Sequence, residues 1–573
     1  MLFNSLPFLF KFLPVTLVGF HLLGRYGRRP VIAWLAFMSV VFYAAWNKAF
    51  VLFLLGSIFA NYLAAHLIAR SPADSPARKK KLAFGVTLNL LALFYFKYLY
   101  KALLLIKALH LAHLNPHPIL LPLGISFFTF TQISYLVDLA QGQAEQQDFL
   151  SYLLFVTFFP HLIAGPILHH KEMMPQFGKL QPASSANEPS DPLLPVPTSR
   201  RFRLKPEDFA LGLTWFLLGL GKKVLIADRL APTADIAFHN AGHLTSANAW
   251  VGLITYSMQL YFDFSGYSDM ALGLARMFSI RFPLNFDSPY KATSVTEYWQ
   301  RWHMTLTRYI TLYLYNPLLL SIQRRRVLSG KKISRKALAT PAGFIAMIAY
   351  PTLFTMLLTG IWHGAGLQFA LFGLIHGIYL TANQAWRHFR QRTRISGAPS
   401  IAVSPRWVGW KRFTSPHTLS RFAMMLGVYL QVTFALIFFR AESTHSAFAL
   451  LADLFGRHGH GTFDELLAGA LAFALFPIVW FFPNTQQILG QEPTRDLSPH
   501  PNPTAAALSP TPSTLTGSSP NTSTINSNPA PTPTLLTRLR WTPNLPWAVV
   551  MFALFFAILA NLDSTARFLY FQF

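Results

Sequence analysis

The sequence predicts an all-α protein that crosses a membrane many times. Of its 573 residues, 52% are hydrophobic and only 12% are charged, whereas soluble globular domains carry about 25% charged residues. Continuous apolar runs such as FVLFLLGSIFANYLAAHLIA recur along the chain, and a helix needs about 20 mostly apolar residues to span a bilayer. The runs are too continuous for the alternating strands of a membrane barrel. We therefore expect a polytopic helix bundle with about 11–13 membrane helices.

The apolar runs place the expected helices. They are residues 6–23, 31–46, 49–69, 82–107, 120–139, 150–166, 209–227, 249–279, 341–360, 367–386, 420–439, 466–483 and 546–562. The first of these segments, 6–23, lacks the positively charged start and the cleavage site of a signal peptide, so we expect it to be retained as a helix. The stretch 280–322 is less apolar and rich in aromatic residues and arginine, which favours an amphipathic or re-entrant segment buried against protein.

Basic residues outnumber acidic ones, 48 against 22, for a formal charge of +26. The charge sits in short loops between apolar runs, which indicates cytoplasmic loops rather than a nucleic-acid surface. Loops 24–29 and 70–81 fall on one face, and a third basic cluster joins them: Arg324, Arg325, Arg326, Lys331, Lys332, Arg335 and Lys336. The absence of cysteine excludes disulfides and thiolate catalysis.

Two polar segments interrupt the expected bundle. Residues 178–204 are rich in proline and serine, and residues 487–540 form a low-complexity segment rich in proline, serine and threonine. Such compositions bury too little apolar surface to offset the entropy of ordering. We expect a membrane domain over 1–486, a linker over 487–540, and a last helix with the end of the domain over 541–573.

The octapeptide TGIWHGAG, residues 359–366, places His363 in a segment otherwise suited to a membrane interior. Ionisable groups are costly there, so His363 is a functional candidate. Gly360, Gly364 and Gly366 allow a backbone or a ligand to approach closely. The structural alternative is a histidine that only bonds a neighbouring helix.

Polar residues also interrupt the run 256–278, namely Asp263, Ser265, Tyr267, Ser268 and Asp269. A buried hydrogen-bond network that holds the bundle together is the structural explanation, and we assign these residues a supporting role. Downstream, His303 belongs to the motif RWHMTLTRY, and Asn285 precedes this motif. Helical i, i+4 spacing would put Trp299 and His303 on one face.

Six blocks in order resemble the membrane-bound O-acyltransferase family. They are PLGISFFTFTQISYLVD (122–138), FFPHLIAGPI (158–167), YFDFSGYSDMALG (261–273), YWQRWHMTLTRYITLYLYNPL (298–318), GIWHGAG (360–366) and FLYFQF (568–573). The chain is most similar to the bacterial branch that contains the membrane subunit of alginate O-acetyltransferase. One departure is YLYNPLLL at 313–320, where many alginate-type members have a YIPLGG-like sequence, and this leaves the acceptor open.

The resemblance implies a helical fold around a tunnel, with His363 as the principal catalytic residue and His303 as the second. Trp302 and Trp362 accompany them as tunnel residues. It also implies acetyl-CoA as donor, no permanently bound cofactor, periplasmic partner proteins, a polysaccharide acceptor and the bacterial inner membrane. Peptidoglycan O-acetylation is the nearest alternative, and D-alanyl transfer is a more distant one.

The residue chemistry agrees independently with acyl transfer. A hydroxyl that attacks a thioester must lose its proton, and neutral imidazole with a pKa near 6.5 accepts protons at neutral pH. Since no serine or cysteine nucleophile motif is evident, direct transfer is the simpler route, and a ping-pong route through histidine stays open. A transporter with a histidine proton relay is the alternative of another class, but the internal repeats of transporters are absent.

The remaining binding predictions concern phosphate and metal. The basic residues Arg324, Arg325, Arg326, Lys331 and Lys332 would attract the phosphates of CoA, although the positive-inside rule already accounts for them. The segment HLAHLNPHP, 110–118, offers histidines, but a solvated turn is the simpler interpretation. We therefore expect no metal site.

Overall fold

The computed structural model describes residues 2–111, 115–178, 206–393, 416–462, 466–467, 469–491, 539–562 and 569. Most of the predicted linker 487–540 and most of the predicted loop 178–204 lie outside these residues. The chain forms two compact units, one made of Met1–Phe482 and Pro543–Phe573, and one made of Pro483–Thr542. In the described ranges every regular element is a helix, as the sequence predicts.

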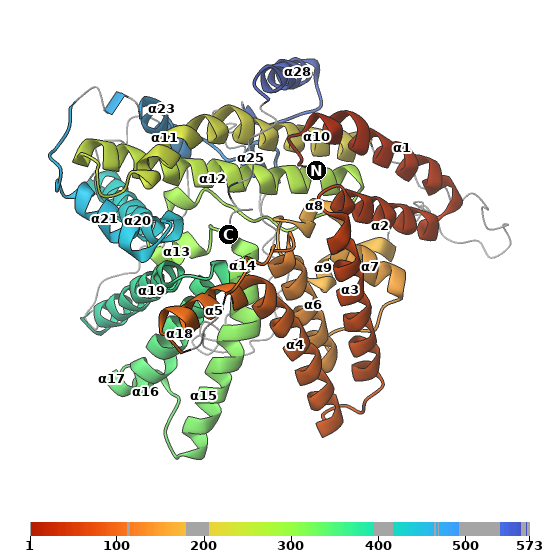
Figure 1. Ribbon diagram of the computed structural model, residues 1–573, viewed down its shortest axis with the longest axis horizontal. Helices are drawn as coiled ribbons and strands as arrows, with labels where there is room; N and C mark the ends of the chain where they lie inside the picture. The colour runs from red at the N-terminus through yellow and green to blue at the C-terminus, as the bar shows by residue number, and fades with distance from the viewer. Residues whose placement is uncertain are drawn as a thin grey trace, which may run out of the picture. The chain divides into compact units, whose positions relative to one another are not determined.

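The first half of the large unit contains short helices as well as long ones (Figure 1). In chain order they are η1 (Phe8–Phe12), α1 (Leu13–Leu23), η2 (Gly24–Tyr26), α2 (Arg28–Ala44), α3 (Lys48–Ala69), α4 (Pro76–Lys97), α5 (Leu99–Ala108), α6 (Ile125–Ala140), α7 (Phe149–Thr157), α8 (Phe159–Leu162), α9 (His170–Gly178), α10 (Pro206–Gly221), η3 (Lys222–Ala227), α11 (Asp228–His239) and α12 (Ser246–Met277).

The second half of the large unit contains the RWH and WHG blocks. Its helices are η4 (Pro289–Lys291), α13 (Val295–Trp299), α14 (Met304–Ile310), η5 (Thr311–Tyr315), α15 (Asn316–Leu328), α16 (Arg335–Leu338), α17 (Pro341–Phe344), η6 (Ile345–Ala349), α18 (Tyr350–His363), α19 (Leu367–Thr393), α20 (Pro416–Arg440), α21 (Thr444–Leu454), α23 (Ala470–Ala474), α24 (Phe476–Phe481) and α28 (Leu545–Ala560).

Helix α12 is the central element of the large unit. It is 32 residues long and almost entirely buried between neighbouring helices. Glycines let α10 pack directly against it: a Cβ at Gly219 would lie 2.6 Å from the carbonyl oxygen of Gly266, and one at Gly273 would lie 2.5 Å from that of Gly212. Any larger side chain would separate the two backbones, so these positions fix the α10–α12 distance.

Five helices are long and apolar enough to cross a membrane in the described part of the chain: Phe8–Tyr26, Lys48–Ala69, Pro206–His239, Pro341–His363 and Leu419–Arg440. The pair α4–α5 makes a sixth if it counts as one broken span. Three shorter apolar helices are Ile125–Ala140, Ala470–Phe481 and Leu545–Ala560. The sequence-based number is higher because it also counts segments such as α12, whose polar residues lower its hydropathy, and broken segments such as 150–166.

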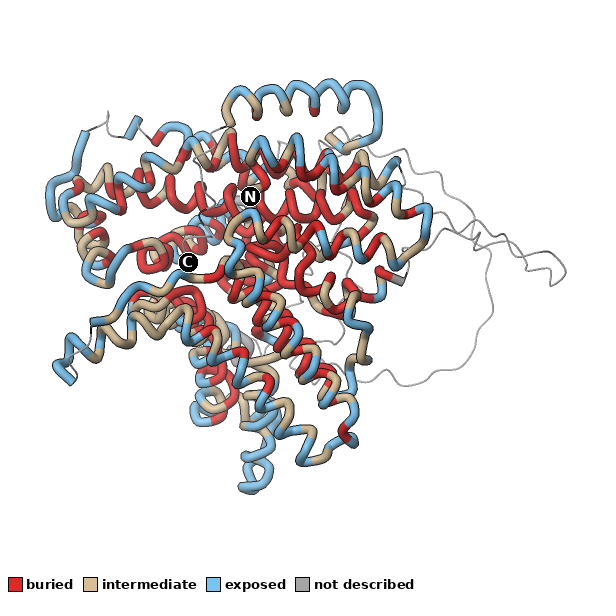
Figure 2. The backbone as a smooth tube through the Cα atoms, turned by 45° about the vertical axis from the view of Figure 1, so that its right-hand side comes forward, coloured by how far each residue is buried: buried red, intermediate tan, exposed pale blue. Residues whose placement is uncertain are grey.

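Exposed residues follow the outer helices (Figure 2), and many of them have large apolar side chains. Leu52 is 77% exposed on α3, Phe84 is 70% exposed on α4, and Phe552 is 66% exposed on α28. Large apolar surfaces are unfavourable in water, whereas they are well accommodated by the lipid tails of a membrane. Together with the apolar helices, this identifies a multi-pass membrane protein.

Three local predictions are wrong. The segment 82–107 is not one helix, since α4 and α5 meet at a bend of 59° after Lys97. Segment 150–166 stops at Thr157, where Phe158 leaves the helical conformation before Pro160. Trp299 and His303 do not share a helix face, because α13 ends at Trp299 and α14 begins only at Met304.

The region 280–322 combines irregular chain with the short helices η4, α13, α14 and η5 and the start of α15. Much of it is buried against the surrounding helices, including Phe286, Tyr290 and Tyr298. This agrees with the prediction of a segment buried against protein.

Candidate active site

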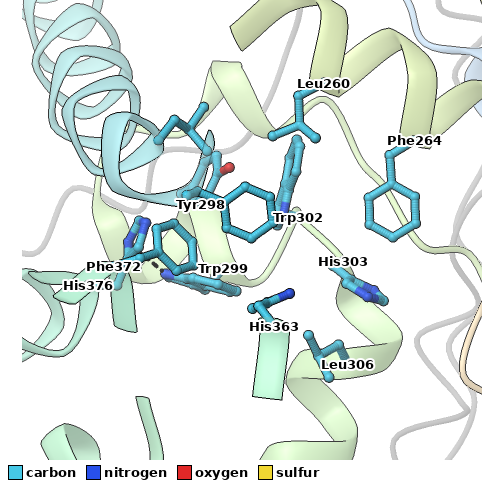
Figure 3. Close-up of a pocket in the computed structure, with 12 residues that line it drawn as sticks. Leu260, Phe264, Tyr298, Trp299, Trp302, His303, Leu306, His363, Phe372 and His376 are labelled. Carbon is cyan, nitrogen blue, oxygen red and sulfur yellow. Dashed lines mark hydrogen bonds between the residues drawn. The ribbon is translucent and has the colours of Figure 1, made fainter. Parts of the chain in front are cut away.

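A small internal cavity of about 20 Å³ lies where six elements meet. It is lined by Leu260, Phe264, Tyr298, Trp299, Trp302, His303, Leu306, His363, Phe372, His376, Leu436 and Phe439. Figure 3 shows His363 drawn between Trp299 and His303, with His376 beyond Trp299. A space of this size holds about one water molecule. An acetyl group must therefore displace some of the surrounding side chains to enter.

His363 is the last residue of α18 and is only 6% exposed. Its ring packs against the rings of Phe439 and Phe372, with centroids 5.0 Å and 6.0 Å away. The preceding turn touches α19 through glycines, since a Cβ at Gly360 would lie 2.2 Å from the carbonyl oxygen of Phe369. The predicted close approach at Gly360 is thus confirmed, and the approaching chain is the backbone of α19.

The end of α18 is also held by two residues at the α4–α5 bend. Lys97 Nζ donates to the carbonyl oxygen of Trp362 and lies 5.6 Å from the centre of the Trp362 ring. The Tyr98 hydroxyl donates to the carbonyl oxygen of Ile361 over 2.9 Å. The last carbonyls of a helix lack intrahelical partners, so side-chain donors satisfy them. The two residues therefore stabilise the turn that carries His363.

Trp362 itself is buried beside the cavity, although it does not line it. Its indole stacks on Phe130 with centroids 5.0 Å apart, and Phe130 stacks on Tyr309 at 4.5 Å. Trp302 does line the cavity and packs edge-on against Phe286 at 5.0 Å. Both tryptophans thus pack close to the histidines, and their role as tunnel residues stays a prediction.

His303 reaches the same cavity from a different segment and is 1% exposed. Its backbone has a φ of 43° and a ψ of 53°, a left-handed conformation that is uncommon for residues other than glycine and costs about 1–3 kcal/mol. This conformation separates α13 from α14 and turns the histidine inward. Surrounding hydrogen bonds must hold it there.

Asn285 supplies those hydrogen bonds. Its Oδ1 lies 3.0 Å from His303 Nδ1 and also accepts from the Thr305 amide at 3.3 Å and the Thr305 hydroxyl at 2.9 Å. A backbone N–H can only donate, so the atom that faces it is the amide oxygen. His303 Nδ1 therefore carries the proton, and in the neutral ring Nε2 is the basic nitrogen.

A cluster of charges fixes the loop that carries Asn285. The Asp287 amide donates to the Arg301 carbonyl over 2.9 Å, and the Arg301 guanidinium in turn contacts Asp287 Oδ2 at 3.3 Å and Glu297 Oε1 at 2.9 Å. Burial alone would raise the pKa of the Glu297 carboxyl, but hydrogen bonds from Thr293 and Arg301 outweigh it and lower that pKa. Glu297 thus stays ionised and keeps Arg301 in place.

His376 is a third cavity histidine that the sequence analysis missed. It lies on α19, is 1% exposed, and its Nδ1 accepts a hydrogen bond from the Trp299 indole over 3.3 Å. The tripeptide IHG at 375–377 resembles WHG, since both place a histidine before glycine in an apolar run. That likeness was an available signal, as was Lys97, a lone charge inside the run LALFYFKYLY.

The polar residues of α12 occupy other places. Asp263 forms an ion pair with Lys223 over 2.6 Å, and Asp269 pairs with Lys222 over 2.6 Å. Asp263 also accepts from the Leu569 amide at 3.0 Å, near the end of the chain. Neither aspartate lines the cavity, and neither do Ser265 and Tyr267. The ion pairs of the two aspartates connect α12 to η3, and a supporting role for all four residues stays a prediction.

The basic cluster of residues 324–336 does not reach the cavity either. Arg324, Arg325, Lys331 and Lys332 are exposed at the end of α15 and in the following turn, and Arg326 is half-buried. None of them lines the cavity. Contact of these side chains with the donor phosphates therefore stays a prediction about the surface of the protein.

Comparison with known proteins identifies similar sequences. The profile of the family described as "MBOAT, membrane-bound O-acyltransferase family" matches residues 86–330. A peptidoglycan O-acetyltransferase of Helicobacter pylori is 35% identical over 487 residues, which cover 80% of this chain and 80% of that protein. A probable alginate O-acetylase AlgI of Pseudomonas aeruginosa is 34% identical over 463 residues, covering 79% and 75%. A teichoic acid D-alanyltransferase of Streptococcus thermophilus is 25% identical over 268 residues, covering 46% and 57%.

Proposed function

Because the chain belongs to the membrane-bound O-acyltransferase family, we propose that this acyltransferase moves acetyl groups from acetyl-CoA to sugar hydroxyls of a polysaccharide outside the cytoplasm. The observation that carries the proposal is the pair of buried histidines, His303 and His363, around one cavity. They come from segments that are sixty residues apart. An ordinary structural histidine has no need of such a neighbour.

The proposed reaction needs one base and one site that orients the reactants. His363 takes the proton of the acceptor hydroxyl while the hydroxyl oxygen attacks the thioester carbonyl carbon. The carbon–sulfur bond then breaks, and the CoA thiolate leaves and receives a proton from the imidazolium or from solvent. General base catalysis of this kind contributes about 10²–10⁴-fold. His303 orients the acceptor or the acyl group through its basic Nε2.

The surroundings of the two histidines support this chemistry. Aromatic and aliphatic side chains enclose the cavity, so water competes little with the acceptor hydroxyl for the thioester. The α18–α19 contact and the residues of the α4–α5 bend hold His363, whereas Asn285 holds His303. Rigid support of both rings favours proton transfer between fixed positions.

The names of the similar proteins suggest the class of acceptor. One acts on peptidoglycan and another on alginate, and both polymers are glycans that offer sugar hydroxyls. The two identities, 35% and 34%, do not favour either polymer. We propose the bacterial inner membrane as the location, with a donor that enters from the cytoplasm. Periplasmic partner proteins would carry or present the acceptor, as the family resemblance implies.

The test is transfer by the purified protein from radiolabelled acetyl-CoA. Wild type is compared with His363→Ala and His303→Ala at equal amounts of monodisperse protein, with the exposed His445→Ala as the control. We expect at least a hundredfold loss for His363→Ala and wild-type activity for His445→Ala. Undiminished transfer by His363→Ala would refute the catalytic assignment.

Two further measurements define the donor and the acceptor. Labelled D-alanyl and acetyl donors are supplied in parallel, and transfer of D-alanine alone would overturn acetyl-CoA as donor. Purified peptidoglycan and secreted polysaccharide from cells with and without the protein are then analysed for ester-linked acetate. The polymer that loses acetate is the acceptor, and unchanged acetate in both would contradict the proposed function. If His303→Ala still hydrolyses the thioester without acylating the acceptor, His303 acts on the acceptor side.

A further inference from the structure

A second buried polar cluster lies outside the cavity and has no part in the proposed reaction. It consists of Asp138 near the end of α6, His169 and His170 at the start of α9, and Tyr313 in η5. In the described part of the chain, Asp138, His169 and His170 alone form a group of at least three potential metal ligands within 4.8 Å of one another.

The donor atoms of this cluster converge on one carboxylate oxygen. Asp138 Oδ2 lies 2.6 Å from His169 Nε2 and 3.4 Å from His170 Nδ1. The Tyr313 hydroxyl is 2.7 Å from Asp138 Oδ2 and 2.6 Å from His169 Nε2. The side chains of Asp138 and His170 are only 5% and 7% exposed, and that of His169 is 15% exposed. Water is therefore largely excluded from the donors.

The charges around Asp138 are unusual for a buried carboxylate. Among the described residues, its ion-pair partners are the two histidines, with no lysine or arginine. The nearby Arg308 is already bound to Glu172, with its Nη2 2.7 Å from Glu172 Oε2. A buried charge is costly unless a counter-charge compensates for it. Either a protonated histidine or a bound cation can supply that positive charge.

His170 favours the cation. Its Nδ1 lies 3.4 Å from Asp138 Oδ2 and its ring approaches the backbone of Gln143, yet neither buried ring nitrogen is close and aligned enough for a hydrogen bond. Buried polar atoms nearly always have partners, so an exception calls for an explanation. A metal ion bound to Nδ1 would satisfy the atom that faces the carboxylate.

We propose that Asp138, His169 and His170 bind a divalent transition metal, with zinc as the favoured ion. Two imidazole nitrogens and one carboxylate oxygen, with a fourth ligand from water or a neighbouring group, form a donor set that zinc uses. Ligands about 2.0–2.1 Å from a tetrahedral zinc stand about 3.3 Å apart. The His170–Asp138 spacing already fits, and the His169–Asp138 spacing must widen by less than about 1 Å.

The expected role of the metal is structural. It would tie α6 to the start of α9 and displace the contact that the Tyr313 hydroxyl makes with both donors. Tyr313 packs on Tyr309 with ring centroids 4.9 Å apart, and Tyr309 belongs to α14, the helix that begins directly after His303. A metal at this point would therefore stabilise the segment behind His303 without touching the reactants. The inference departs from the expectation, based on the sequence, of no metal site.

The test uses the full-length protein, purified in detergent through a tag that contains no histidine. The protein is stripped with a chelator, incubated with zinc alone, dialysed, and analysed by elemental mass spectrometry. We expect about one zinc ion per chain in wild type and less than a tenth of that in His170→Ala and in Asp138→Asn. Zinc should also raise the melting temperature of wild type but not of these variants, because binding to the folded state stabilises it.

Two controls separate this site from other histidines. A triple variant, His110→Ala with His113→Ala and His117→Ala, removes the histidine-rich segment and should retain the zinc. Tyr313→Phe, which lacks the competing hydroxyl, should also retain it. Wild type decides the question even if a ligand variant fails to fold. If stripped wild type retains no zinc, or if a folded His170→Ala binds as much zinc as wild type, the cluster is a hydrogen-bond network and the proposal is wrong.

Discussion

The side chain of Asn285 connects the unusual backbone of His303 to its proposed chemistry. One amide oxygen fixes the proton on His303 Nδ1 and also accepts from Thr305, while the amide nitrogen donates to the Ser268 hydroxyl over 3.1 Å. Asn285 therefore joins α12 to the start of α14. Without Asn285, the ring of His303 would lose the hydrogen bond that fixes its tautomer.

Asn285→Ala should lower kcat by about 10–100-fold, because a lost buried hydrogen bond is worth about 1–3 kcal/mol and each 1.4 kcal/mol is tenfold in rate. KM should change less, since the side chain does not line the cavity. Steady-state transfer from acetyl-CoA measures both constants. Thr311→Ala, which removes an exposed hydroxyl from the neighbouring turn, is the control. An unchanged kcat in a correctly folded Asn285→Ala would contradict the role of Asn285.

We expect His376 to act through its hydrogen bond with Trp299 rather than on the reactants. His376→Phe removes the acceptor of the Trp299 indole, whereas His376→Gln keeps an acceptor on a side chain of similar length. We expect His376→Phe to lose about tenfold in kcat/KM, the value of a lost buried hydrogen bond, and His376→Gln to recover most of it. Equal activity of the two variants would show that the hydrogen bond to Trp299 is not what matters.

At the scale of elements, the position of His363 depends on the contact between α18 and α19. The two helices touch at Gly360 and Gly373, where a Cβ on Gly373 would lie 2.2 Å from the carbonyl oxygen of Met356. Backbone atoms cannot move aside as flexible side chains do. The distance between these helices is therefore set by the absence of a side chain at two positions.

Gly360→Ala should force α18 and α19 apart and cost about 1–3 kcal/mol in the free energy of unfolding, as overpacking generally does. The loss of transfer activity should be larger than the loss of stability alone would cause, because His363 lies three residues away on the displaced turn. The control is Gly427→Ala on α20, where a Cβ would meet nothing within 4 Å and helix propensity favours alanine by about 1 kcal/mol. Melting temperature and transfer activity are measured for both variants. If Gly360→Ala changes neither the melting temperature nor the transfer activity, this contact does not support His363.

The sequence predicted elements well where one physical signal dominated. Long apolar runs gave α3 and the central α12 within a few residues, because the need to satisfy every backbone group inside a membrane allows little except helix. The bend after Lys97 was not predicted, since Lys97 and Tyr98 bind carbonyls of a helix more than 260 positions away in the sequence. The prediction that Trp299 and His303 share one helix face was wrong, because i, i+4 spacing places two residues on one face only if the helix continues between them.

At the scale of the whole molecule, the site joins segments that no local pattern could bring together. His303, His363 and His376 meet around one cavity, and the family resemblance assigned roles only to the first two. Which polar groups of α12 face the cavity also depends on packing: the aspartates pair with Lys222 and Lys223 instead. Composition and motif order predict the fold class, and the family resemblance names the two histidines to which we assign catalysis. The third histidine and the supports of the other two follow only from tertiary contacts.

The unit Pro483–Thr542 bears on the interpretation of the long polar segment. Within this unit, the Trp541 amide donates to the carbonyl oxygen of Ile488 over 2.8 Å, and the position of a Cβ on Gly490 would lie 3.2 Å from Arg540 Nε. The residues just before and just after segment 492–538 therefore lie side by side. A short connection can span this distance as well as a long one, because the free energy of closing a loop changes only slowly with its length.

Replacing residues 494–536 with a short glycine–serine linker should leave transfer activity within about twofold of wild type and shift the melting temperature little, since each doubling of loop length changes stability by only about 0.6 kcal/mol. The matched variant replaces the same residues with a scrambled sequence of equal length and composition. If the shortened chain loses activity while the scrambled chain keeps it, length matters, and the segment acts as a spacer. If both lose activity at equal folded amounts, the sequence of the segment binds a partner, and the interpretation of the segment as a simple linker is wrong.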